Sequence, residues 1–73
     1  MKFFCDNMRH LICEPYTIKN LHFMAKQLNV GRWWFHGFCR YPHYDIPKRR
    51  IKEIQSKCIV IPAKDLLLKI KNS

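Results

Sequence analysis

The sequence predicts an α/β protein: a small three-stranded parallel sheet covered by helices, in the order β-α-β-α-β-α. The main observation is alternation, because short apolar runs take turns with stretches whose apolar positions recur at helical spacing. The second is size, since 73 residues with 48% apolar content predict a single domain, residues 1–73, with a small core. Such a core supplies little surplus stability, so self-association into a homo-oligomer is also a hypothesis.

The first half of the chain predicts one strand, one loop and one helix. The strand is expected at residues 2–6, a short and nearly continuous apolar run. Residues 8–16 are expected to form a loop, because Pro15 blocks a regular helix there. Thr17 is a good N-cap for a helix that runs to about Leu28. The apolar face of that helix would comprise Ile18, Leu21, Met24, Ala25 and Leu28.

The second half predicts two strands and two helices. Residues 32–36 are expected to form the second strand, with aromatic side chains alternating between its faces, and residues 37–45 a loop. A second helix is expected from 47 to about 57, with a proline in its first turn. Residues 58–61 are rich in β-branched side chains and are expected to form the third strand. A final helix is expected at about 62–71.

Titratable side chains follow the first two predicted strands. Asp6 ends the first strand, with Arg9 and His10 just beyond it. His43 and Asp45 come after the second strand. In an open parallel sheet, ligands bind beyond the carboxyl ends of the strands. The predicted topology therefore brings these residues to one edge of the sheet.

Three of these residues have two interpretations. Asp6, His43 and Asp45 are candidate catalytic residues, since carboxylates and imidazole can move protons or hold a divalent ion beside a phosphate. Alternatively, Asp6 and Asp45 only bond the backbone at a turn and a helix start, and His43 bridges them. The chain has no nucleophile-elbow, zinc-protease or phosphate-loop motif. Ligand binding is therefore favoured over catalysis. We expect a binding protein rather than an enzyme.

No cofactor is expected, although a divalent metal remains an open hypothesis. The i, i+4 spacing of Cys39 and His43 suggests metal ligands, but Pro42 prevents a regular helix from using it. Structural zinc is therefore not expected. It would need a four-residue set assembled from Cys13, His22, Cys39 and His43.

The charge points to an anionic partner. The formal net charge is +9, from 14 basic and 5 acidic residues, and a basic surface attracts nucleic acid, nucleotides or acidic proteins. Lys48, Arg49 and Arg50 lie at a predicted helix start, where anions are favoured. Trp34 and Tyr44 could stack on a base. The alternative is that the basic cluster is a solvated face and the aromatics are core.

The sequence also bears on location. No segment reaches transmembrane length, so no membrane contact is expected. The apolar run at 1–5 is too short for a signal peptide. We therefore expect a cytoplasmic location and cysteines that remain thiols.

Several motifs resemble one known family. They are the segments 5–10, 21–25, 34–35, 43–45 with 48–50, and 60–67. Their order and residue types are similar to the small bacterial and phage proteins catalogued as domain of unknown function 4031. The resemblance implies a common fold and a phage or bacterial setting, and it implies no activity. The loop before Thr17 is shorter here and lacks the family's His-Met segment, so a site that needs that histidine would be altered unless His10 replaces it.

These observations predict a binding protein for a phosphate-bearing ligand, either nucleic acid or a nucleotide-like small molecule. One alternative is a phosphoester-hydrolysing enzyme that uses Asp6, His43 and Asp45. Another is a small inhibitor that docks on an acidic host protein. The expected ligand-binding residues are Asp6, Arg9, His10, Trp34, His43, Tyr44, Asp45, Lys48, Arg49 and Arg50.

Overall fold

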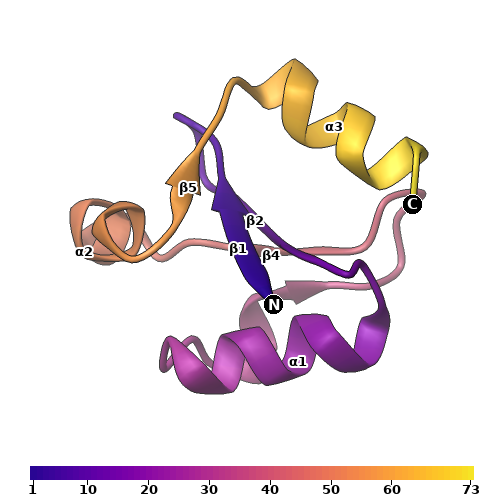
Figure 1. Ribbon diagram of the computed structural model, residues 1–73. Coiled ribbons are helices and arrows are strands. Elements are labelled where there is room, and N and C mark those ends of the chain that lie inside the picture. The colour runs from indigo at the N-terminus through magenta and orange to yellow at the C-terminus, as the bar shows by residue number, and fades with distance from the viewer.

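The computed structural model describes residues 1–73 as a five-stranded mixed sheet with three helices (Figure 1). In spatial order the strands are β3 (Phe35–His36), β4 (His43–Asp45), β2 (His10–Glu14), β1 (Lys2–Cys5) and β5 (Ile59–Val60). The helices are α1 (Ile18–Gln27), α2 (Ile51–Ser56) and α3 (Ala63–Lys71). Each helix is too short, or insufficiently apolar, to cross a membrane.

The predicted three-stranded parallel sheet is wrong. The pairs β1–β2, β2–β4 and β3–β4 are antiparallel, and only β1–β5 is parallel. The decisive element is β2, which lies in the segment 8–16 that was expected to be a loop. Pro15 blocks a helix, but it does not block a strand that ends at Glu14. The turn at 6–9 is too short for a parallel crossover, so β2 returns antiparallel beside β1.

The second predicted strand is also shorter than expected. Residues Arg32–Trp34 form a 3₁₀ turn, and only Phe35–His36 is extended. The expected loop 37–45 contains β4, which pairs with both β3 and β2. Because β1 and β3 run in opposite directions, their carboxyl ends do not share an edge. The predicted route to a site is therefore wrong, although a different pairing brings several of the same residues together.

Helices α1 and α3 lie close to their predicted ranges. Helix α1 begins after Thr17, whose hydroxyl accepts a hydrogen bond of 3.0 Å from the backbone N–H of Asn20. Helix α3 falls within one residue of its predicted range. The predicted helix 47–57 is shorter in the structure, because Lys48–Arg50 is a 3₁₀ turn and α2 follows it.

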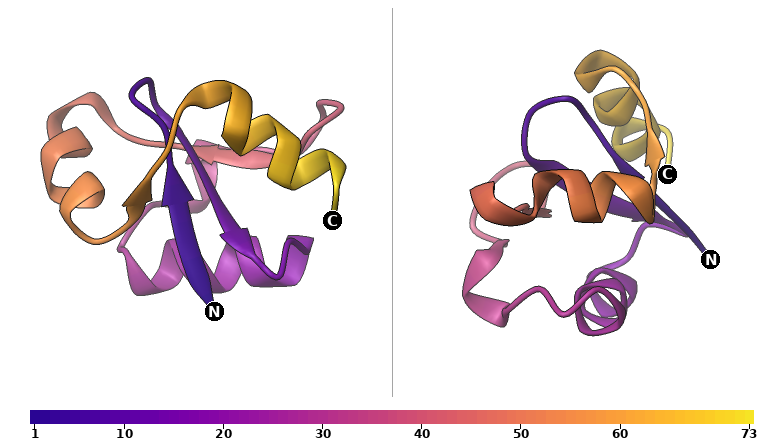
Figure 2. Two further views of the ribbon diagram at one scale, coloured as in Figure 1. Left: turned by 45° about the horizontal axis from the view of Figure 1, so that its top comes forward. Right: turned by 90° about the vertical axis from the view of Figure 1, so that its left-hand side faces the viewer.

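The helices form two layers around the sheet. Helix α1 covers one face and α3 lies over the other, near β1 (Figure 1). Helix α2 lies along the side of the sheet and contacts β5 (Figure 2). Since α3 lies over β1, it leaves much of β4 and β3 uncovered. The apolar core includes Leu11, Leu21, Met24, Tyr44 and Ile54.

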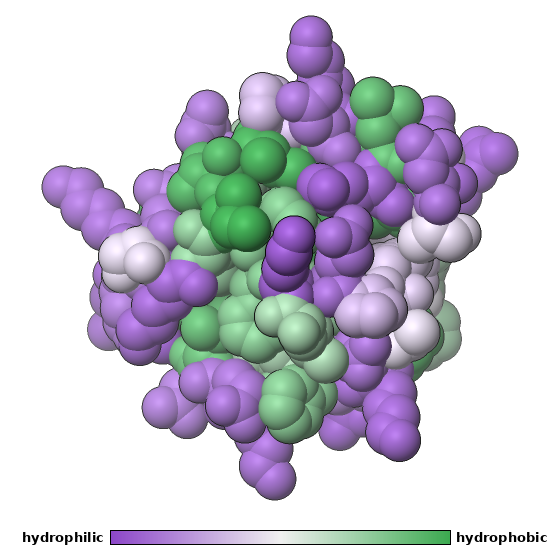
Figure 3. All heavy atoms as spheres, viewed as in Figure 1, coloured by the Kyte–Doolittle hydropathy of each residue, from purple (hydrophilic) through white to green (hydrophobic).

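The surface combines long polar side chains with exposed apolar ones. On the face seen in Figure 3, an apolar area gathers on the side where β5 lies in Figure 1. Two exposed apolar residues, Ile59 and Val60, belong to this edge strand.

All four cysteines are free thiols, and burial raises the pKa of Cys58 to about 12. The edge strand β5 is therefore held by its pairing with β1 and not by a disulfide.

Candidate functional site

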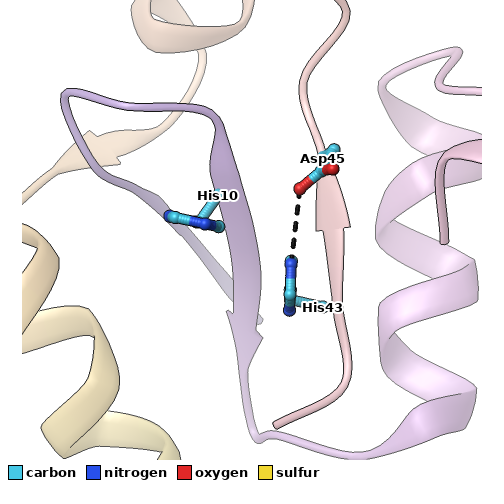
Figure 4. Close-up of side chains that lie close together, drawn as sticks. All are labelled: His10, His43 and Asp45. Atoms are coloured by element: carbon cyan, nitrogen blue, oxygen red, sulfur yellow. Dashed lines mark ion pairs between the residues drawn. The ribbon is translucent and has the colours of Figure 1, made fainter. Parts of the chain in front are cut away.

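The pairing of β4 with its two neighbours brings polar side chains together. His10 of β2 lies opposite Asp45 of β4, and His36 of β3 lies opposite His43 of β4. Residues opposite one another in antiparallel strands project from the same face, as do residues two apart on one strand. All four side chains therefore project from the face of the sheet on which α3 lies, and Figure 4 shows three of them. We call His10, His36, His43 and Asp45 the histidine–aspartate cluster.

Asp6 holds His10 in place from beneath. Its side chain is fully buried and accepts hydrogen bonds from the backbone N–H groups of Met8 (2.9 Å) and His10 (3.1 Å). Its second oxygen lies 2.7 Å from Nδ1 of His10. Asp6 therefore stabilises the β1–β2 turn and orients the imidazole of His10.

Asp45 contacts two imidazoles. Its Oδ2 lies 2.7 Å from Nε2 of His36, and its Oδ1 lies 3.3 Å from Nε2 of His43. The rings of His36 and His43 stack with their centres 5.4 Å apart. The ring of His10 meets that of His43 edge-on at 5.1 Å. The four side chains thus form one contiguous group across three strands.

The hydrogen bonds fix which ring nitrogens carry hydrogen. Nδ1 of His43 lies 2.7 Å from the carbonyl oxygen of Tyr41, which can only accept, so this nitrogen donates. Nδ1 of His10 donates to the carboxylate of Asp6 in the same way. In the neutral rings, Nε2 of His10 and Nε2 of His43 are therefore the nitrogens with a free lone pair.

Two hollows open onto the cluster. The first, which we call the basic hollow, has a volume of about 480 Å³ and is lined by Met8, Arg9, His10, Asp45, Lys48 and Ile51. The second, the α3 pocket, has a volume of about 420 Å³ and lies between the cluster and α3, with Tyr41, Leu66 and Ile70 in its lining. His10 lines both hollows, so the cluster can be reached from two sides.

The predicted basic residues divide into two kinds. Arg50 donates to the carbonyl oxygens of Leu28 (2.7 Å) and Asn29 (2.6 Å) and pairs with Glu53 at 2.8 Å. These bonds tie the end of α1 to α2, and the Arg50 bonds hold the pKa of Glu53 at about 2. Lys48 and Arg49 are exposed and make no ion pair. Lys48 lines the basic hollow and Arg49 does not.

The predicted aromatic residues also divide. Tyr44 is fully buried on the α1 side of β4, so it offers no ring face to a base. Trp34 is half-buried, and the guanidinium of Arg9 lies 5.9 Å from the centre of its ring. Arg9 also donates from Nε to the carbonyl oxygen of Ile46 at 2.9 Å. These contacts fix the Arg9 side chain beside the basic hollow.

Sequence reasoning missed His36, which bonds Asp45 more closely than His43 does. The signal was its alternation with Phe35 in a strand, but the partner strand β4 was not predicted. The four-residue zinc set does not assemble: Cys13 is buried and His22 bonds the hydroxyl of Tyr44 at 2.7 Å. Cys39 lies 3.9 Å from Nδ1 of His43, the nitrogen that faces away from Asp45.

The fold and the site define a small α/β protein with a mixed sheet and a histidine–aspartate cluster beside a basic hollow. The chain belongs to the family described as protein of unknown function (DUF4031), whose family model matches residues 2–65. This match confirms the resemblance seen in the local motifs. No curated protein and no solved structure matches the chain. The family description assigns no activity.

Proposed function

We propose that the protein binds a phosphate-bearing ligand, either nucleic acid or a nucleotide-like small molecule, at the basic hollow. The observation that carries this proposal is the presence of Arg9 and Lys48 in one concavity with His10. Phosphate recognition needs cationic donors that converge on one concave place. Lys48 is exposed, and the unused guanidinium nitrogens of Arg9 can still donate. The ligand's phosphate would lie between these two side chains.

The overall charge supports the same partner. A formal charge of +9 draws anions toward the surface and raises their rate of encounter. Arg50 and Tyr44 are excluded from the proposed contacts, because the first holds α1 and α2 together and the second is buried. Asp6 is buried, and in this proposal it orients His10 and does not contact the phosphate itself. The ligand-contacting set is thus smaller than the sequence predicted and centres on Arg9, His10 and Lys48.

Hydrolysis of a phosphoester is a second candidate, and one observation favours it. Nε2 of His43 lies 3.3 Å from Asp45, a pairing that can accept and release a proton next to a bound phosphate. In this candidate function the buried Asp6 would act by holding His10 through their 2.7 Å hydrogen bond. Incubation with cyclic and linear nucleotides, followed by mass spectrometry of the released small molecules, separates the two functions. Intact nucleotide supports binding, whereas turnover that disappears in His43→Ala supports hydrolysis.

Binding itself is tested with a labelled single-stranded oligonucleotide and with a nucleoside monophosphate at rising salt. We expect Lys48→Ala to weaken binding and to reduce the slope of log affinity against log salt by about 0.7 for the oligonucleotide, the value for one lost phosphate contact. The matched control is Lys52→Ala, which removes an exposed lysine that does not line the hollow. Equal effects of the two variants would contradict a site at the basic hollow. No binding of either ligand would leave an acidic protein partner as the better hypothesis.

A further inference from the structure

We propose that Nε2 of His10, Nε2 of His43 and Oδ1 of Asp45 bind one divalent transition-metal ion. Each of the three residues offers a ligand atom within 4.8 Å of the others (Figure 4). The residues come from two neighbouring strands, so the sheet itself sets their spacing. The metal site is argued from its own geometry. Only its role, which is to help hold the phosphate of the ligand, rests on the proposed function.

The surroundings of both imidazoles match those of metal ligands. A histidine that binds a metal through one nitrogen almost always donates from the other to a carboxylate or a backbone carbonyl. Here Nδ1 of His10 donates to the buried Asp6, and Nδ1 of His43 donates to the carbonyl of Tyr41, both at 2.7 Å. Each ring is thus held through Nδ1, and the lone pair of each Nε2 is left to bind an ion.

Asp45 is also held in a way that leaves one oxygen available. His36 occupies Oδ2 at 2.7 Å, so Oδ1 is the oxygen left for an ion. This Oδ1 lies 3.3 Å from Nε2 of His43. With both Nε2 and Oδ1 acting as acceptors, the two atoms repel each other, and a shared cation turns the repulsion into attraction. A proton on Nε2 has the same effect, so the experiment must distinguish the ion from the proton.

The geometry needs only a modest contraction. Zinc–nitrogen and zinc–oxygen bonds are about 2.0–2.2 Å, which places ligand atoms in a tetrahedral shell about 3.4 Å apart. The present spread of up to 4.8 Å is wider than that. The His10 side chain is 38% exposed and borders two hollows. Its ring therefore has room to move toward His43 and Asp45 while it keeps the hydrogen bond to Asp6.

The donor set indicates the class of ion. Imidazole nitrogens suit zinc, iron, cobalt, nickel and copper, whereas magnesium and calcium prefer oxygen ligands. Three protein ligands leave at least one coordination position open. Asp45 borders the basic hollow, so an open position there faces the place proposed for the phosphate. The ion would also offset the negative charge of Asp45, which by itself opposes an anionic ligand.

The test is a titration of the chelator-treated full chain with Co²⁺, followed by visible absorption, and with Zn²⁺, followed by calorimetry. We expect one ion per chain and a Co²⁺ spectrum typical of nitrogen and oxygen ligands. His10→Ala and His43→Ala should each weaken binding by at least about 100-fold, beyond the range of about 10–100-fold typical of a lost supporting residue. His36→Gln, which alters a positioning residue, should fall within that range.

Two control variants keep the result interpretable. His22→Gln removes an imidazole that lies outside the cluster and should leave the affinity for Co²⁺ unchanged. Cys39→Ser should leave the Co²⁺ spectrum unchanged, because its sulfur faces the other nitrogen of His43. A thiolate charge-transfer band that disappears in Cys39→Ser would overturn the proposed ligand set. Far-UV circular dichroism of each variant separates a lost ligand from a lost fold.

The outcome also distinguishes the metal site from the proposed function. If no ion binds but nucleotide binds in the presence of chelator, the metal site is wrong and phosphate binding stands. If the ion binds but neither inorganic phosphate nor nucleotide binds with it, the metal site stands and the proposed function is wrong. Equal ion affinity of the wild type and His43→Ala would overturn the site, because the bound ion would then lie elsewhere.

Discussion

Strand β4 gives the two faces of the sheet opposite properties. On the α1 face, Tyr44 is fully buried and its ring packs 5.2 Å from Phe35 and 5.9 Å from His22. On the α3 face, His43 and Asp45 keep part of their side chains exposed beside two hollows. Three consecutive residues thus serve both a closed core and an open polar site. The difference shows that burial, rather than residue type, separates the structural residues from the candidate ligands.

The two histidines His22 and His10 sharpen this comparison. His22 shares a 2.7 Å hydrogen bond with the hydroxyl of Tyr44 and packs 4.6 Å from Phe35. Burial, with a smaller contribution from Arg32, lowers its pKa. His10 instead has one nitrogen bonded to Asp6 and a second that borders both hollows. The two imidazoles therefore differ in the group that holds them, which is a buried tyrosine hydroxyl for His22 and a buried carboxylate for His10.

The largest expected effect contrasts two neighbours on β4. Tyr44→Ala should lower the free energy of unfolding by about 3–5 kcal/mol, as for other large buried aromatic residues. His43→Ala should lower it by about 0.5–1.5 kcal/mol, the value of one hydrogen bond, since its ring is partly exposed. Urea denaturation measures both values. Similar losses in the two variants would contradict the division between a closed and an open face.

A smaller effect tests the polar link inside the closed face. Tyr44→Phe keeps the ring but removes the hydroxyl that bonds His22. We expect a loss of about 0.5–1.5 kcal/mol in the free energy of unfolding, again by urea denaturation. The control is Tyr41→Phe at a half-buried tyrosine whose hydroxyl makes no hydrogen bond within the chain, and this change should alter stability by less than about 0.5 kcal/mol. If the control costs as much, the His22–Tyr44 bond contributes nothing specific.

The helices could be predicted from sequence because their signals are local. Thr17 and the apolar spacing after it define α1 without reference to any other part of the chain. Sheet pairing is not local, and two of the strands have only two residues each. Both two-residue strands, β3 and β5, lie within the predicted strands 32–36 and 58–61. The strands that were missed are β2 and β4, which lie in the expected loops 8–16 and 37–45, because they become strands only through pairing with distant segments.

The site was predicted in part, and for a reason that proved wrong. Asp6, His10, His43 and Asp45 do converge, but they converge through the antiparallel pair β2–β4 and not through the ends of parallel strands. The same local pattern could not separate Tyr44 from its neighbours. Its burial depends on α1 packing against the opposite face of the sheet. The tertiary contacts, rather than the motif, therefore decide that His43 and Asp45 line the two hollows while Tyr44 packs against α1.

The smallest expected effect concerns protons on the closed face. Because the pKa of His22 is lowered from 6.5, the folded chain binds this proton less readily than the unfolded chain. Unfolding therefore takes up a proton below about pH 6.5. The contribution of neutral His22 to the free energy of unfolding is fully present above that pH and is lost as the pH falls through the lowered pKa. His22→Gln keeps a hydrogen-bonding side chain beside Tyr44 but cannot titrate. Its free energy of unfolding, from urea denaturation between about pH 7.5 and about pH 5, should fall less steeply than that of the wild type. Parallel curves would show that His22 is as accessible to protons as an exposed histidine, and the contrast with His10 would lose its basis.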